Sequence, residues 1–414
     1  MNETALLQVV IVGAGHAGVE TAAALRQHGF SGAITILGEE PDLPYQRPPL
    51  SKEFLKSPQD SSLPLKGEAF YATGDIELRL GAVAERIDRD ERELVLKGGA
   101  RIPYDHLVLA TGARNRFPPI RGLEPSQMLE LRTLAHARAL TQRLPALKRV
   151  AVIGGGFIGL EVAALLRQRD IAVDVVEAAP RLMGRVLSPA MSDAFRRFHQ
   201  AMGTGLYLGV VADEIVQRGD GFALSLSDGR VIEADAVVMA AGVTPNVELA
   251  AEAGLTIGNG VVVDAQLLTS DPAISAIGDV AAHPNPYGGS DDLIRLESVQ
   301  NAVDQARCVA ARLCGKPQTY DVLPWFWSHQ GAIKLQIAGL ATGVDETVTR
   351  GDPASEKFSV FVYRAGRLIA VESVNSPADH MVARRLIAAG INVPPAVAAD
   401  VTADLKALMP KAAA

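Results

Sequence analysis

A glycine-rich motif that occurs twice constrains the fold more than any other feature of this 414-residue chain. Residues 13–26 read GAGHAGVETAAALR, and residues 154–167 read GGGFIGLEVAALLR. The two segments are identical at eight of fourteen positions, at a constant offset of 141 residues. Each copy follows a short apolar run and continues as an Ala- and Leu-rich helix. The repeat therefore predicts two βαβ units of the same kind.

The glycine spacing GxGxxG, placed between a strand and a helix, is typical of a phosphate-binding turn. The first glycine allows the tight turn, the second lets the backbone approach a pyrophosphate, and the third lets helix and strand pack closely. The free N–H groups and partial positive charge of the helix N-terminus then attract the phosphates. We predict two dinucleotide cradles, formed by Gly13, Gly15 and Gly18 and by Gly154, Gly156 and Gly159.

A carboxylate closes the second β-rich run of each copy. Glu39 lies 21 residues after Gly18, and Glu177 lies 18 residues after Gly159. A carboxylate at this place accepts hydrogen bonds from ribose hydroxyls and repels a 2′-phosphate. Glu177 therefore favours NADH over NADPH, although Arg181 and Arg185 follow closely and would weaken that preference.

Composition and charge argue against several classes of function. Lys plus Arg total 40 and Asp plus Glu total 47, which gives a net charge of −7 and argues against nucleic acid as the main partner. Two cysteines, Cys308 and Cys314, cannot supply a four-thiolate iron–sulfur cluster, and His283 and His329 show no metal-ligand spacing. The N-terminus lacks a targeting signature and no apolar run is long enough to span a membrane. We expect a cytoplasmic protein without a metal or membrane partner.

The chain after about residue 321 has a different pattern. The segments LPWFWSHQ, IKLQIAGL, FSVFVYRAG and RLIAVESVN predict strands joined by turns, followed by a helix over Pro377–Ala389. The predicted fold class is thus α/β, with two Rossmann-like dinucleotide-binding domains and a C-terminal α/β domain.

Nearly the whole chain resembles the FAD-dependent, NADH-using ferredoxin reductases of bacterial oxygenase systems, the putidaredoxin, rubredoxin and dioxygenase reductase type. The apoptosis-inducing factor is a more distant relative. The resemblance rests on the cradles and on YQRPPLSK (45–52), LVLATG (107–112), AIGD (276–279), RLESVQNAVDQA (295–306) and PWFWS (324–328). It implies a glutathione-reductase-like arrangement, with an FAD domain over 1–112 and 242–320, an NADH domain over 113–241 and a C-terminal domain over 321–414 that covers the flavin ring.

Site residues follow from the resemblance position by position. It implies FAD contacts at Ala17, Glu39, Arg47, Pro48, Lys52, Ala84, Thr111, Gly112, Arg132, Gly278, Asp279, Val299 and Trp327. The Asp279 carboxylate would accept a hydrogen bond from a ribityl hydroxyl. The second cradle, Glu177 and Arg185 would bind NADH. Phe157 stands where Tyr is frequent and would lie on the flavin ring. Trp327 and Glu297 would lie beside the edges of the flavin ring and the nicotinamide amide.

Lys52 and Glu161 are the candidates for tuning the flavin. Reduced flavin gains negative charge that a nearby lysine stabilises, and a buried lysine needs a carboxylate partner. The alternatives are that Lys52 is a solvated loop lysine and Glu161 only a residue at the start of a helix. For Trp327 the alternative is a core aromatic of the third domain.

The acceptor of the electrons is indicated partly by what the sequence lacks. No cysteine pair stands where related disulfide reductases carry one, so a thiol route is not expected. The resemblance favours a [2Fe–2S] ferredoxin serving a haem monooxygenase or an aromatic-ring oxygenase, and an acidic ferredoxin would dock on local cations. An NADH:quinone or NADH:oxygen oxidoreductase and a redox-sensing interaction protein stay open as alternatives. The candidate docking cations, each also explicable as a solvated face residue, are Arg295, Arg307, Arg312 and Lys316.

Overall fold

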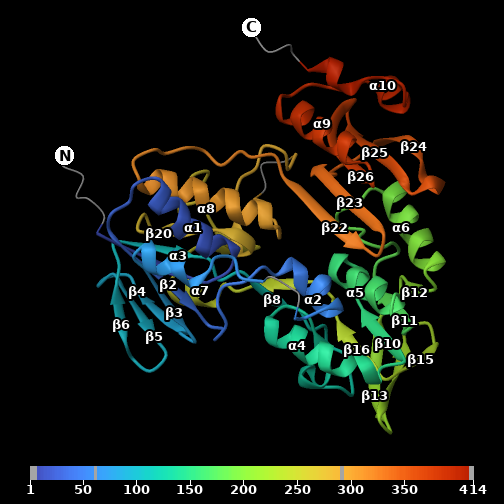
Figure 1. Cartoon of the computed structure of the whole chain (residues 1–414), viewed down its shortest axis with the longest axis horizontal. Helices are drawn as coiled ribbons and strands as arrows, with labels where there is room; N and C mark the ends of the chain where they lie inside the picture. The colour runs from blue at the N-terminus through green and yellow to red at the C-terminus, as the bar shows by residue number, and fades with distance from the viewer. Residues whose placement is uncertain (1–6, 60–62, 290–292, 410–414) are drawn as a thin grey trace. The chain divides into compact units, whose positions relative to one another are not determined.

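The computed structural model describes residues 7–59, 63–289 and 293–409. Its contacts divide the chain into two compact units (Figure 1). The first unit consists of Met1–Gln46, Ser62–Arg114 and Thr244–Val322. The second consists of Arg47–Ser61, Asn115–Val243 and Leu323–Ala414.

A parallel five-stranded sheet in the order β20-β7-β1-β2-β3 forms the centre of the first unit. Strand β1 (Gln8–Val12) pairs with β2 (Ala33–Gly38) on one side and with β7 (His106–Leu109) on the other. Helix α1 (His16–Gln27) connects β1 to β2. The outer strands are β3 (Ile76–Leu80) and β20 (Ile274–Ala276).

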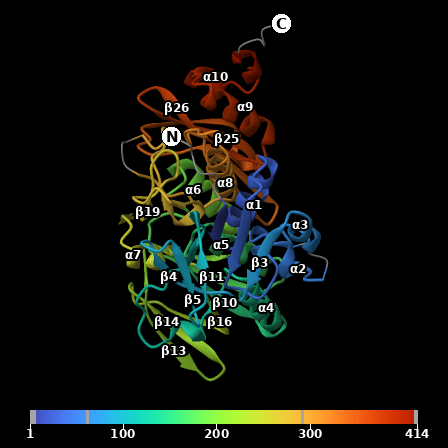
Figure 2. The ribbon, with the colours of Figure 1, turned by 90° about the vertical axis from the view of Figure 1, so that its left-hand side faces the viewer.

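Further helices, among them α3 (Glu68–Thr73), and two small sheets complete this unit. Helix α8 (Val299–Leu313) packs beside α1, as Figures 1 and 2 both show. Cys308 lies within α8, whereas Cys314 is the residue that caps its end. The remaining elements are the antiparallel strands β4 (Ala84–Asp88), β5 (Glu93–Leu96) and β6 (Arg101–Pro103), helix α7 (Glu248–Glu252), and the short strands β18 (Ile257–Gly258), β19 (Gly260–Val262) and β21 (Ala281–Ala282).

The second unit repeats this plan with the second glycine motif. Its parallel sheet has the order β12-β11-β10-β16-β9, and helix α5 (Phe157–Arg167) connects β10 (Arg149–Ile153) to β11 (Ala172–Glu177). Strand β16 (Ala236–Met239) lies on the other side of β10. The other elements are β9 (Leu129–Glu130), α4 (Leu134–Arg143), α6 (Pro189–Ala201), β12 (Gly205–Leu208) and the antiparallel strands β13 (Ala212–Arg218), β14 (Gly221–Leu226) and β15 (Val231–Ala234).

The C-terminal part of the second unit is an antiparallel sheet in the order β22-β23-β26-β25-β24. Helix α9 (Pro377–Ala388) packs on β26 and β23, and ends one residue before the predicted end. Four of these strands were predicted from the sequence, and β24 was not. The bounds are β22 (Trp325–Gln330), β23 (Ile333–Gly339), β24 (Glu346–Asp352), β25 (Lys357–Arg364), β26 (Arg367–Val374) and α10 (Pro395–Ala399).

The predicted fold class, two Rossmann-like domains and a C-terminal α/β domain, is confirmed. The proline-rich segment after Arg47 forms a 3-10 turn, η1 (Pro48–Ser51), followed by the short helix α2 (Glu53–Lys56). Proline fixes φ at a value that suits the first positions of such a turn. Among the described residues, no helix is both long and apolar enough to cross a membrane.

Candidate active site

The first glycine cradle is a closely packed turn between β1 and α1. Gly13 has a φ of 117°, and a Cβ there would collide with the carbonyl oxygen of Ala110. A Cβ on Gly18 would collide with the carbonyl oxygen of Gly13. At Gly15, by contrast, no described atom lies within 4 Å of the Cβ position. The outer glycines thus serve packing within the protein, while the middle one faces open space.

The second cradle repeats this geometry. A Cβ on Gly154 would collide with the carbonyl oxygen of Ala240, and one on Gly159 with that of Gly154. The Cβ position of Gly156 again has no described atom within 4 Å. Gly15 and Gly156 are the N-caps of α1 and α5, and a glycine has no side chain to satisfy the first N–H groups of a helix. Both helix ends therefore fit an anionic ligand.

The carboxylate beside the second cradle is held by the backbone. Glu177, the last residue of β11, accepts hydrogen bonds from the Gly155 N–H (2.6 Å) and the Ala179 N–H (2.7 Å). The guanidinium of Arg181 instead donates to the Leu187 carbonyl (2.5 Å). Arg185 is exposed, with Nη2 3.4 Å from the Cβ position of Gly242.

In the first unit, a second segment of the chain meets α1 beside the first cradle. Ala17 is buried on α1, and its Cβ lies 3.3 Å from the Cβ position of Gly278, whose φ is 74°. Asp279 follows in the 3-10 turn η4 (Gly278–Val280), and Val299 is the first residue of α8.

The other predicted FAD residues of this unit lie at the ends of strands or just after them. Glu39 is exposed directly after β2, and Ala84 begins β4. The Thr111 hydroxyl donates to the Asn246 carbonyl (2.8 Å), and Gly112 has a φ of 67°.

The second unit contains a buried ion pair. Lys52 Nζ lies 2.5 Å from Glu161 Oε2, and the exposed fractions of the two side chains are 13% and 3%. The Ser51 hydroxyl donates to the same oxygen (2.5 Å), and the Ser328 hydroxyl donates to Glu161 Oε1 (2.8 Å). Together, these three contacts offset the free-energy cost of removing the Glu161 carboxylate from water. Glu161 lies in the second turn of α5, so it is not at the helix start.

A series of buried hydrogen bonds, which the sequence did not predict, continues from the Lys52–Glu161 pair. Gln330 Nε2 donates to Ser328 Oγ (3.2 Å), and Gln330 Oε1 lies 2.9 Å from His199 Nε2. Burial lowers the pKa of His199. Polar residues on the inward face of β22 were the available signal, because a strand that buries Ser and Gln must give them partners.

Aromatic side chains group on the same unit. The ring of Phe157 lies 4.6 Å from that of Phe326, centre to centre, and Trp327 lies 5.4 Å from Trp325. Trp327 is half-buried on β22.

The turn that contains Pro48 is tied to the segment before α4. The Arg47 guanidinium donates to the Arg132 carbonyl (2.5 Å). This bond holds the turn, and the lysine that follows it, against a second part of the same unit.

The predicted docking cations divide into two kinds. The side chain of Arg295 is only 9% exposed and pairs with Glu297 (2.7 Å). The Arg312 guanidinium donates to the fully buried Ser275 hydroxyl (2.6 Å). Arg307, which pairs with Glu20 (2.7 Å), and Lys316 are exposed. Arg295 and Arg312 therefore point inward.

The described part of the chain holds no group of three or more His, Cys, Asp or Glu residues that could bind a metal. Burial raises the pKa of the Cys308 thiol to about 11, which disfavours the reactive thiolate.

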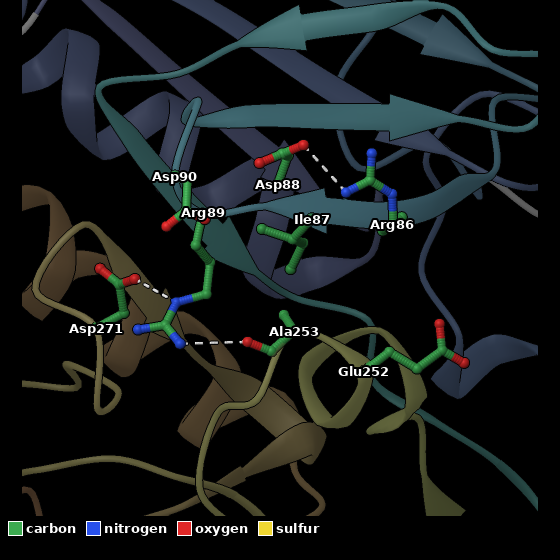
Figure 3. Close-up of a pocket in the computed structure, with 8 residues that line it drawn as sticks. All are labelled: Arg86, Ile87, Asp88, Arg89, Asp90, Glu252, Ala253 and Asp271. Carbon is green, nitrogen blue, oxygen red and sulfur yellow. Dashed lines mark hydrogen bonds and ion pairs between the residues drawn. The ribbon is translucent and has the colours of Figure 1, made fainter.

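A pocket in the first unit is separate from every predicted site residue. Figure 3 shows charged side chains around it, among them Arg86 and Asp88, and the Arg89–Asp271 ion pair at 2.7 Å. The same Arg89 donates to the Ala253 carbonyl (3.3 Å). These arginines are already paired, and we assign the pocket no function.

Two dinucleotide cradles on parallel sheets, with a buried lysine–carboxylate pair, define a two-cofactor oxidoreductase. A family model described as "Pyridine nucleotide-disulphide oxidoreductase" matches residues 7–306, and one described as "Reductase C-terminal" matches residues 325–409. The chain belongs to the pyridine nucleotide-disulphide oxidoreductase family.

Curated relatives and solved structures agree with this family. Rhodocoxin reductase of Rhodococcus erythropolis is 49% identical over 97% of this chain and 94% of its own length. Putidaredoxin reductase of Pseudomonas putida is 38% identical over 98% and 97%, respectively. A crystal structure of a ferredoxin reductase from Rhodopseudomonas palustris superposes with a TM-score of 0.94 at 50% identity, covering 97% of this chain and 99% of that one. The predicted family, the enzyme class and the use of FAD with a nicotinamide dinucleotide are thereby confirmed.

Proposed function

We propose that this protein transfers a hydride from NADH to FAD and then passes single electrons to a [2Fe–2S] ferredoxin that serves a haem monooxygenase or an aromatic-ring oxygenase. The observation that carries the proposal is the pair of cradles in which the middle glycines, Gly15 and Gly156, face open space. Bound FAD supplies the conversion between a two-electron donor and a one-electron acceptor.

The first cradle is the proposed FAD site, within an FAD domain of residues 1–112 and 242–320. Its backbone N–H groups bind the pyrophosphate, and Ala17 with Gly278 allows the close approach of two segments there. Glu39 and Asp279 supply carboxylates for ribose and ribityl hydroxyls. Thr111, Gly112, Ala84, Arg132 and Val299 complete the proposed contacts.

The second cradle is the proposed NADH site, within residues 113–241. Glu177 already has two backbone donors that fix its carboxylate, so it presents a defined acceptor and a negative charge to the ribose. Arg181 donates to Leu187 and Ser192 rather than to a ligand position, which supports preference for NADH over NADPH. Arg185 is exposed and is the proposed cation for the dinucleotide.

Lys52 is the proposed electrostatic group at the flavin. Its ammonium stabilises negative charge that develops on reduction, and Glu161 with Ser51 and Ser328 holds it in one position. Phe157, Trp327 and Glu297 are proposed to contact the flavin or the nicotinamide.

A ferredoxin is the acceptor that the relatives support. Rhodocoxin and putidaredoxin reductases are named for their partners, and a solved structure that matches this chain with a TM-score of 0.93 and 37% identity is a covalent putidaredoxin reductase–putidaredoxin complex. We propose that Arg307 and Lys316, the exposed cations of the predicted set, contribute to docking. Arg295 and Arg312 are better explained by their internal bonds.

Stopped-flow absorbance without oxygen tests this function. The flavin of the purified yellow protein should bleach rapidly with NADH and much more slowly with NADPH, and a [2Fe–2S] ferredoxin added next should become reduced. Fast turnover with a quinone and none with any ferredoxin would overturn the partner and keep the cofactor sites. A protein that carries no flavin, or whose flavin NADH does not bleach, would overturn the proposal as a whole.

A further inference from the structure

A fully buried carboxyl group, Glu372, has no part in the function proposed above. It lies on β26, in the middle of the C-terminal sheet, and its side chain is 0% exposed. The Ser188 N–H donates to Glu372 Oε1 (2.7 Å), and the Ser188 hydroxyl donates to Oε2 (2.5 Å). A buried carboxyl is costly without such bonds. The pair is therefore a specific tie between the C-terminal sheet and the residue that precedes α6.

Ser188 is the N-cap of α6, and its hydroxyl also accepts from the Met191 N–H (3.3 Å). It ends the segment 178–188, which begins directly after Glu177 and contains Arg181 and Arg185. Figure 1 shows α6 beside the C-terminal sheet, as these bonds require. The position of the segment after the ribose carboxylate is thus linked to a strand residue that lies 184 positions beyond Ser188 in the sequence.

A second tie reaches the middle of the same segment. Gln330 on β22 donates through Nε2 to the sulfur of Met183 (3.6 Å). Met183 has a φ of 50°, a left-handed conformation that a non-glycine residue adopts only when its surroundings hold it there. Its N–H donates to the carbonyl oxygen of Gly155 in the second cradle (2.9 Å). The segment is therefore fastened at once to the cradle and to the C-terminal sheet.

We infer that Glu372 is a positioning residue for NADH binding, which holds the segment 178–188 in its binding conformation from the C-terminal sheet, with Gln330 as the second tie. The inference rests on the proposed function, in which the second cradle and Glu177 bind NADH. A site held in its bound conformation binds more tightly, because the ligand does not have to order it. The C-terminal sheet thereby contributes to NADH affinity through residues that do not touch the dinucleotide.

Stopped-flow reduction of the full-length FAD-bound protein tests this inference. Flavin bleaching at varied NADH concentrations gives an apparent Kd and a limiting rate. We expect Glu372→Gln and Ser188→Ala each to raise the apparent Kd roughly fivefold or more, with the limiting rate changed less than about twofold. The double variant should be little worse than the single variants, because both disrupt the same bond between the Ser188 hydroxyl and the side chain of residue 372.

The matched control is Ser373→Ala, the next residue on β26, whose hydroxyl bonds with Ser359 (3.0 Å) instead of segment 178–188. It should leave the apparent Kd unchanged. An unchanged Kd in both test variants, a fall in limiting rate alone, or an equal rise in the control would overturn the inference. Ser188→Ala carries the test if Glu372→Gln loses FAD. Failure of the proposed function is distinguishable, because then NADH would not bleach the wild-type flavin.

Discussion

Glu161 illustrates at the scale of one residue how the environment decides a role that a sequence leaves open. Its side chain is 3% exposed and contacts Lys52, Ser51 and Ser328. Such a carboxylate requires a cation and hydroxyl donors, and these contacts turn Lys52 inward. The alternatives of a solvated lysine and a helix-start glutamate are therefore inconsistent with the structure.

Replacing Lys52 should show its contribution to flavin reduction and its contribution to stability as two separate effects. We expect Lys52→Met to slow the limiting rate of flavin reduction about tenfold or more and to destabilise the second unit by roughly 3 kcal/mol, because Glu161 becomes a buried unpaired charge. Lys52→Met combined with Glu161→Gln should regain most of the stability without the rate. Stopped-flow reduction and thermal unfolding measure the two effects, and a double variant that also recovers the rate would contradict the role of Lys52.

The middle glycine of each cradle offers a matched pair of substitutions. Gly15 and Gly156 have φ values of −85° and −83°, which alanine adopts, and their Cβ positions have no described atom within 4 Å. We expect Gly15→Ala to weaken FAD retention and Gly156→Ala to raise the Kd for NADH at least about tenfold, because each methyl group fills space needed by a pyrophosphate. Flavin content and NADH titration measure these losses. Loss of NADH affinity in Gly15→Ala together with loss of flavin in Gly156→Ala would mean that the two cradles bind the opposite cofactors.

At the scale of elements, the third glycine of each motif sets how closely a helix approaches its strand. A Cβ on Gly159 would collide with the carbonyl oxygen of Gly154, which is backbone and has no rotamer to change. The two helices α1 and α5 can lie over their sheets only because this contact is free of side-chain atoms.

Gly159→Ala should therefore disrupt folding, whereas Gly156→Ala should leave folding intact. We expect Gly159→Ala to give little soluble holoprotein or to lower the melting temperature by several degrees, on the scale of a clash that costs about 1–3 kcal/mol. Gly156→Ala should melt like the wild type. Thermal unfolding of the two variants side by side is the measurement, and equal melting temperatures would show that the helix adjusts more easily than the geometry indicates.

At the scale of the whole molecule, buried histidines predict sensitivity to acid. Burial lowers the pKa of His106 to about 3 and the pKa values of His283 and His380 to about 4, against 6.5 for an exposed histidine. The Arg384 guanidinium adds a smaller contribution in the same direction at His380. Because the unfolded chain takes up these protons first, this stability is complete above pH 6.5 and falls as the pH decreases toward 4.

We expect the melting temperature of the holoprotein to fall steadily between about pH 6.5 and about pH 4.5. Glu372 has the opposite effect on stability. Burial raises its pKa from 4.5 to about 7, so between these pH values the folded protein holds a proton that the unfolded chain has lost. Acidification through this range therefore increases the contribution of Glu372 to stability. Glu372→Gln should therefore show a steeper loss on acidification than the wild type. Calorimetry at several pH values measures both slopes, and a flat wild-type profile would contradict the role of the histidines.

The regular parts of the fold could be predicted from the sequence because their signals are local. Apolar runs, the repeated glycine motif and the Ala-rich helices predicted β1, α1, β10 and α5. Strand β24 was missed because, as an edge strand with mostly exposed residues, it has little hydrophobic alternation to reveal it.

The sequence by itself determined the two dinucleotide cradles, since a glycine motif specifies backbone conformation over a few residues. Only the tertiary structure decided which distant side chains meet: Ser328 with Glu161, Gln330 with Met183, and Glu372 with Ser188. It also decided that Arg295 and Arg312 point inward. The physical reason is that a buried polar group must find partners wherever packing places them, and no local pattern in a single sequence records a contact between residues so far apart along the chain.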